Sequence, residues 1–183
     1  LFKIIGTSFL IIIPLLLIIA CSEGATETNK SPKVDLLTAV ATANIDMIKQ
    51  HITFGTDINA VFVETEDWKG AGALHIAVIS PTNAESVMKY KTVVELLLSG
   101  GANIDIKARN QDAATPLAWA VYFGKAEMVE FLLARSANVN AADKNGYTPL
   151  DGALASPFMG SELNRSAIVS FLRNKGAKTR SDD

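Results

Sequence analysis

The sequence predicts an all-α fold built from about four stacked helix pairs, and three recurring patterns predict it. A Thr-Pro-Leu triplet occurs twice at a fixed spacing. A stripe of aliphatic residues with helical spacing follows at a similar distance each time. A short segment that begins with glycine or serine then closes each unit. Self-similarity at such a period is typical of helical repeat proteins, so the patterns predict a solenoid.

The triplets mark the first helix of a repeat. Thr115-Pro116-Leu117 recurs 33 positions later as Thr148-Pro149-Leu150. Threonine can cap a helix by accepting from a backbone N–H of the first turn. Proline is tolerated in that turn because its missing N–H would have no helical partner. Each triplet therefore predicts a helix start at its proline.

The aliphatic stripes mark the second helix. Residues spaced i, i+3 and i+4 lie on one face of a helix, so such a stripe predicts a buried face. The stripes are Val94, Leu97 and Leu98; Val129, Leu132 and Leu133; and, in part, Val169 and Leu172.

The closing segments predict where each second helix ends. They are residues 55–59, 101–105, 136–140 and 176–178. Glycine suits the left-handed residue that commonly ends a helix. Ser136 is the exception, because the other three segments begin with glycine.

These landmarks resemble the ankyrin-repeat family across residues 34–180. The resemblance implies a solenoid of about four helix-pair repeats with projecting β-hairpin turns, in units near 35–66, 67–109, 110–142 and 143–180. It also aligns four alanines where a small side chain lets the two helices of a pair approach closely: Ala39, Ala77, Ala120 and Ala153. Unit one lacks the triplet, and unit four has Arg173 where Leu98 and Leu133 stand. Such polar changes are typical of terminal repeats, so we expect four units to be the complete stack.

Residues 1–20 have the pattern of a signal peptide: Lys3, then an apolar run, then the small residue Ala20. The run is about 17 residues long and contains Pro14, whereas a membrane span needs about 20 apolar residues. A transmembrane anchor is the alternative interpretation.

Residues 18–21, Ile-Ile-Ala-Cys, resemble the bacterial lipobox, which implies that Cys21 is lipidated and becomes the new amino terminus. Two or more acyl chains hold a protein on a membrane where one does not. Ser22 follows Cys21, which favours the outer membrane and a domain facing the periplasm. Residues 21–33 would then be the lipidated cysteine and a flexible tether, because 22–33 carry no large apolar side chain. A buried or free cysteine is the alternative.

The composition gives no reason to expect nucleic acid or a cofactor. The net charge is −2, whereas nucleic-acid binding asks for a basic face. A single cysteine excludes an intrachain disulfide. There is no phosphate-binding loop, no nucleophile motif and no metal-ligand spacing. Two histidines have structural interpretations: His75 lies in a Leu-His-x-Ala segment where the family's histidine bonds backbone, and His51 replaces an aliphatic stripe residue. We therefore expect no enzyme.

The family resemblance implies a partner-binding surface on the hairpin tips and the exposed side of the first helices. Carried over by position, the candidates are Trp68 and Lys69; Gln111, Asp112, Tyr122 and Phe123; and Lys144, Asn145 and Tyr147. The four aromatic residues stand out because aromatic side chains are enriched at interface hot spots. Trp119 falls at an inward position and is expected in the core.

Units two and four carry an insertion between their helices, and each insertion begins with Ser-Pro at the same register, at 80–81 and 156–157. The first holds Met88 and Tyr90, and the second holds Phe158 and Met159. Two alternatives stay open: the loops form a second binding edge, or their apolar residues cover the helix ends. The hairpin before unit two is also long, and we expect Phe62 to lie in a mobile finger.

The sequence therefore predicts a membrane-tethered scaffold or adaptor that binds another protein. The alternative is a stress-protective or inhibitory protein that sequesters a periplasmic enzyme or toxin. An enzyme with a site in the inserted loops and a secreted effector are further hypotheses, and lipidation argues against the effector.

Overall fold

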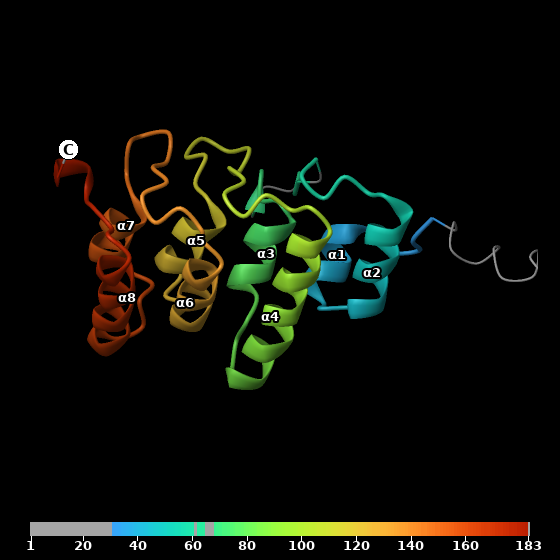
Figure 1. Cartoon of the computed structure of the whole chain (residues 1–183), viewed down its shortest axis with the longest axis horizontal. Coiled ribbons are helices and arrows are strands. Elements are labelled where there is room, and N and C mark those ends of the chain that lie inside the picture. Colours follow the sequence, from blue (N-terminus) through green and yellow to red (C-terminus); the bar gives the residue numbers. More distant parts are fainter. Residues whose placement is uncertain (1–30, 61, 65–67, 183) are drawn as a thin grey trace, which may run out of the picture.

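A computed structural model of the chain describes residues 31–60, 62–64 and 68–182 (Figure 1), and the elements named within these residues are eight α-helices and the 3₁₀ helix η2. The helices are α1 (Leu36–Ala41), α2 (Ile45–Phe54), α3 (Ala73–Ile79), α4 (Ala84–Ser99), α5 (Pro116–Tyr122), α6 (Ala126–Ala134), α7 (Pro149–Ala155) and α8 (Glu162–Asn174), with η2 at Arg180–Asp182. Each predicted unit contains one pair. The predicted all-α solenoid is confirmed.

The helices stack in two layers. The first helices α1, α3, α5 and α7 contact one another in succession, as do the second helices α2, α4, α6 and α8. Connecting turns rise from the same edge of the stack between successive pairs (Figure 1). One continuous core of buried apolar residues runs between the layers.

Local sequence sets the helix boundaries as predicted. The side chain of Thr115 accepts from the N–H of Ala118, and that of Thr148 accepts from the N–H of Asp151. Each triplet proline occupies the first turn of its helix. The closing residues Gly55, Gly101, Ser136 and Gly176 all have positive φ angles, of 83°, 91°, 64° and 80°.

The alanine stripe brings the layers together. Ala39, Ala77, Ala120 and Ala153 are each 0% exposed, one in each first helix. Since interiors are close-packed, a larger side chain at any of these positions would force the helices apart.

The projecting turns differ from the expected β-hairpins. In the described part of the chain, the structure has no named strand and one isolated antiparallel bridge, between Phe62 and Gly72. The expectation of a mobile finger is wrong for Phe62. Its ring is only 8% exposed, and the guanidinium of Arg109 lies 3.9 Å from the ring centroid. Bridge pairing and a cation–π contact therefore hold it against the stack.

The unit-two insertion is helical rather than a loop. It lengthens α4 to 16 residues, against 9 in α6, and α4 extends past its neighbours in Figure 1. Tyr90 is buried, and its hydroxyl donates to the carbonyl of Ala41 at 2.5 Å. Met159 of the unit-four insertion is also buried. Met88 and Phe158 are instead exposed, so each insertion has one residue in the core and one on the surface.

The predicted signal peptide, Cys21 and most of the tether lie outside the described residues. None of the helices that the structure describes is long and apolar enough to cross a membrane.

Candidate protein-interaction groove

A groove of about 690 Å³ runs along the first helices of units three and four and the turns of units two to four. Its walls come from α5, α7 and the turns that precede α3, α5 and α7. Ligand sites are typically concave and mostly apolar, with a few polar groups at defined positions. This groove has that character.

The groove brings together residues that are far apart in the sequence. Seven of the nine partner-binding candidates line it: Trp68, Lys69, Gln111, Asp112, Tyr122, Phe123 and Tyr147. The other two, Lys144 and Asn145, lie outside its lining, on the exposed turn between Asp143 and Tyr147.

One wall of the groove is aromatic. The ring centroid of Trp68 lies 6.0 Å from that of Trp119 and 5.6 Å from that of Phe123. Trp119 is only partly buried and lines the groove, so its expected place in the core is corrected. From the middle of α5, its ring contacts the turn that carries Trp68. Tilted and edge-to-face pairs stabilise this wall beyond the area they bury.

The inserted loop of unit four continues the aromatic wall. Phe158 lies 5.3 Å from Tyr122 and 5.7 Å from Phe123, measured between ring centroids. Phe158 is 54% exposed and Tyr122 is 41% exposed. The predicted partner-binding surface and the unit-four insertion are therefore continuous at this point.

The floor of the groove is made of small residues. Ala118 of α5 and Gly152 and Ala155 of α7 line it. A Cβ placed on Gly152 would find only the side chain of Val121, at 3.9 Å. The space above Gly152 is therefore open, and a polypeptide backbone could approach the helices closely.

Carboxylates gather at the hairpin end of the groove. Asp112, Asp143 and Asp151 line it together with one lysine, Lys69. Partial burial raises the pKa of Asp151, but hydrogen bonds from the backbone N–H groups of Thr148 and Arg180 outweigh this and leave the pKa below its usual value. Asp151 is therefore negatively charged at neutral pH.

The turns that carry these residues are tied to one another. The N–H of Lys144 donates to the carbonyl of Asp112 at 2.7 Å, and that of Arg109 donates to Gly70 at 2.7 Å. Asp143 accepts from the N–H groups of Asn145 and Tyr147 through Oδ1. These bonds fix the rim of the groove before any partner arrives.

His75 supports the aromatic wall from inside. The N–H of Gly72 donates to its Nδ1, so its Nε2 carries the proton and donates to the carbonyl of Ala114. Its ring lies 5.0 Å from that of Trp119. Burial lowers its pKa to about 4. The predicted backbone-bonding role of His75 is confirmed by these contacts.

His51 is also a structural residue. It is 7% exposed, its Nε2 donates to the carbonyl of Val34, and its Nδ1 contacts the Thr56 hydroxyl. Across residues 31–60, 62–64 and 68–182, no group of three or more His, Cys, Asp or Glu side chains could hold a metal ion.

Sequence reasoning missed several groove residues. Trp119 was expected in the core, and the contact of the inserted-loop residue Phe158 with Tyr122 and Phe123 was not anticipated. The small floor residues Ala118, Gly152 and Ala155 were also missed, although Ala155 follows Asp151 by four positions and Gly152 by three, which places it on the same side of the helix as each. That spacing was the available signal.

The helix pairs stack into two layers, each second helix ends at a residue with positive φ, and the stack carries a groove. These features define a helical repeat protein with a recognition surface. The sequence pattern described as ankyrin repeats (3 copies) matches residues 84–183, more than half of the chain. The chain therefore belongs to the ankyrin-repeat family, whose repeats are protein–protein interaction modules.

Curated relatives share the repeats over part of their length. The chain is 26% identical over 148 residues to a putative ankyrin repeat protein, FPV230, of fowlpox virus, covering 67% of this chain and 75% of that protein. It is 35% identical over 88 residues to the probable palmitoyltransferase AKR2 of Saccharomyces uvarum, covering 48% of this chain. The chain spans only 12% of that yeast protein.

Proposed function

We propose that this protein is a membrane-tethered adaptor that captures another protein in the groove of its ankyrin repeats. The observation that carries the proposal is the meeting of Trp68, Tyr122, Phe123 and Tyr147 in one groove, although they come from three different units. Ankyrin repeats supply the general function, and the groove supplies a specific surface for it.

The exposed aromatic side chains favour binding over a purely structural role. Trp68 is 40% exposed and Tyr122 is 41% exposed, yet each packs edge-on or tilted against a neighbouring ring. Rings that are held in place lose little side-chain entropy on binding. Buried aromatic anchors commonly supply most of the energy of an interface.

The amino-terminal pattern supports the tether. Cys21 ends a signal-peptide pattern, and α1 begins at Leu36. An extended chain spans at most about 3.5 Å per residue, so the segment between them reaches on the order of 50 Å. The proposal therefore places the partner close to the membrane surface, with the outer membrane and the periplasm as the compartment favoured by Ser22.

The capture experiment uses the full chain expressed in bacteria and pulled down from solubilised membranes. Trp68→Ala combined with Tyr122→Ala should reduce recovery of the partner by at least tenfold. Met88→Ala is the matched control, because Met88 is an exposed apolar residue on α4 that does not line the groove. Undiminished capture by the double variant would exclude this groove as the binding surface.

The tether is tested by metabolic labelling with an alkyne fatty acid. The wild-type chain should take up label and sediment with membranes, and Cys21→Ser should lose both properties. Label retained by Cys21→Ser would overturn the lipoprotein assignment without bearing on the groove.

A further inference from the structure

The groove has two chemically different ends. Its hairpin end holds the carboxylates Asp112, Asp143 and Asp151, near the starts of α5 and α7. Its other end holds Tyr122 and Phe123, where α5 stops. Phe158 packs against both rings just beyond the lining of the groove. A segment that lies along the groove would therefore meet acid at one end and an apolar surface at the other.

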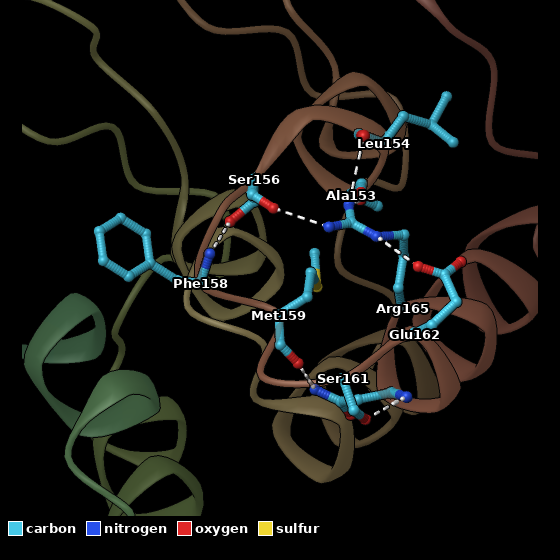
Figure 2. Close-up of polar contacts among 9 residues, drawn as sticks. Ala153, Leu154, Ser156, Phe158, Met159, Ser161, Glu162 and Arg165 are labelled. Atoms are coloured by element: carbon cyan, nitrogen blue, oxygen red, sulfur yellow. Dashed lines mark hydrogen bonds and ion pairs between the residues drawn. The ribbon is translucent and has the colours of Figure 1, made fainter.

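The apolar end is held rigidly by polar contacts beneath it (Figure 2). Arg165 donates through Nη1 to the carbonyl of Ala153 and through Nη2 to that of Ser156. The ring of Phe158 points away from this cluster in the figure. The hydroxyl of Ser156 donates to the carbonyl of Tyr122, which ties the loop to α5. The Phe158 ring is therefore presented by a fixed loop.

Asn164 of α8 also links this loop to unit three. The amide of Asn164 donates to the carbonyls of Gly124 and Met159, both at 2.8 Å. Gly124 approaches the loop closely, since a Cβ there would lie 2.8 Å from the carbonyl oxygen of Phe158. The loop that carries Phe158 is thus held in place by contacts with both unit three and unit four.

The charge of the groove indicates which charged side chain a partner segment would place there. Three carboxylates and one lysine line it among the described residues, and Arg180 lies at its edge, with its guanidinium 4.6 Å from the Tyr147 ring centroid. The carboxylates still outnumber these two cations, so the hairpin end favours a further cation. Complementary charge across an interface fixes register and raises the association rate. Aromatic faces such as that of Trp68 also attract guanidinium and ammonium groups.

We propose that the groove binds an extended segment of a partner protein that carries an Arg or Lys at the hairpin end and a large apolar anchor against Tyr122, Phe123 and Phe158. This inference rests on the proposed function and adds the chemistry of the partner segment. The small residues Ala118, Gly152 and Ala155 let the segment's backbone lie close to the floor.

The length of α5 sets the spacing of the two anchors. Its 7 residues rise about 10 Å at about 1.5 Å per residue. An extended segment covers that length with about three residues at roughly 3.3 Å each. The basic residue and the apolar anchor are therefore about three positions apart in the partner.

The test is selection of a random 12-residue displayed peptide library on the full chain, purified in detergent and immobilised. Enriched peptides should pair Arg or Lys with Leu, Met, Phe or Trp at a spacing of two to four positions. Synthetic peptides of the enriched pattern are then measured by fluorescence anisotropy against the variants.

Gly152→Leu should weaken peptide binding at least tenfold because its side chain fills the floor, and Ser170→Leu on the exposed face of α8 is the steric control. Asp112→Asn should weaken it threefold to tenfold, and added salt should shrink that difference. Glu130→Gln on α6 is the charge control, since Glu130 is exposed and lies outside the groove.

Three outcomes would overturn the inference: enrichment of acidic or uncharged peptides, full peptide binding by Gly152→Leu, or no enriched peptide at all. Partner capture that depends on Trp68 and Tyr122 would still stand in each case. Failure of that capture would instead count against the proposed function.

Discussion

The imidazole of His75 joins two repeats: its Nε2 donates a hydrogen bond of 3.0 Å to the carbonyl of Ala114, at the start of the next unit. Its Nδ1 accepts from the N–H of Gly72 at 3.1 Å. Both ring nitrogens are therefore used by the neutral form. A second proton on Nδ1 would break the Gly72 bond and place a charge in the core.

This bonding predicts that the free energy of unfolding falls in mild acid. The pKa of His75 is about 4 in the folded chain and 6.5 ordinarily, so between these values the unfolded chain binds a proton that the folded chain excludes. The stabilisation is complete above pH 6.5 and declines as the pH falls toward 4. We expect a loss of about 2 kcal/mol from His75 between pH 7 and pH 5, measured by urea unfolding.

His75→Gln is the control for that measurement. Its unfolding free energy should be lower at pH 7 but should change much less between pH 7 and pH 5. Equal pH dependence in the two proteins would contradict the assignment to His75.

Ser136 offers a test of the helix-ending conformation. It has a φ of 64°, where the equivalent residues Gly55, Gly101 and Gly176 have 83°, 91° and 80°. Residues other than glycine are strained at positive φ. Ser136→Gly should therefore stabilise the fold by about 1 kcal/mol and raise Tm by several degrees.

Gly101→Ala is the reciprocal variant. A Cβ on Gly101 would have no heavy atom within 4 Å, so any loss comes from backbone strain alone. We expect about 1 kcal/mol of destabilisation. A neutral result in both variants would show that these helix ends tolerate either residue.

Arg165 and Glu162 form an ion pair, but we expect them to contribute very differently to the free energy of unfolding. Arg165→Met would remove the donors from the carbonyls of Ala153, Leu154 and Ser156 at the end of α7, which should lower the unfolding free energy by about 1–2 kcal/mol.

Glu162→Gln should change it by less than about 0.5 kcal/mol, because the Glu162 side chain is 82% exposed and its ion pair is screened. Thermal melts of the two variants compare them directly. A larger loss for Glu162→Gln than for Arg165→Met would contradict this account of the loop.

Gly152, in the floor of the groove, lowers the stability of α7 relative to an alanine at the same position. It lies within α7, and a Cβ there meets only an ordinary contact with Val121 at 3.9 Å. Gly152→Ala should therefore stabilise the chain by about 0.5–1 kcal/mol, since glycine is the poorer helix former. A destabilised variant, by chemical unfolding, would mean that α7 needs the glycine for packing.

The fold was predictable because its signals are local and repeated. Thr115 and Thr148 cap helices through their own side chains. One alanine in each first helix is buried at the same position of the repeat: Ala39, Ala77, Ala120 and Ala153. The same register placed Trp68, Tyr122 and Tyr147 on the surface that forms the groove.

The insertions were harder to predict, because nothing local decides whether inserted residues extend a helix or form a loop. In α4 they extended the helix, since Tyr90 could pack on unit one and reach the carbonyl of Ala41. In unit four part of the insertion forms a loop and part lengthens α8 to 13 residues, against 9 in α6. Ser156 and Asn164 tie that loop to unit three, and Arg165 ties it to the end of α7.

Local sequence encodes the repeat period, the helix starts and the buried alanine stripe, because each depends on residues within one turn or one repeat of each other. The packing of the repeats is what places Trp119 in the groove lining and Phe158 against Tyr122. Those positions depend on how one repeat rotates onto the next, which brings Phe158 within 5.3 Å of Tyr122. No short-range pattern encodes that rotation, because it follows from the packing of whole helix layers.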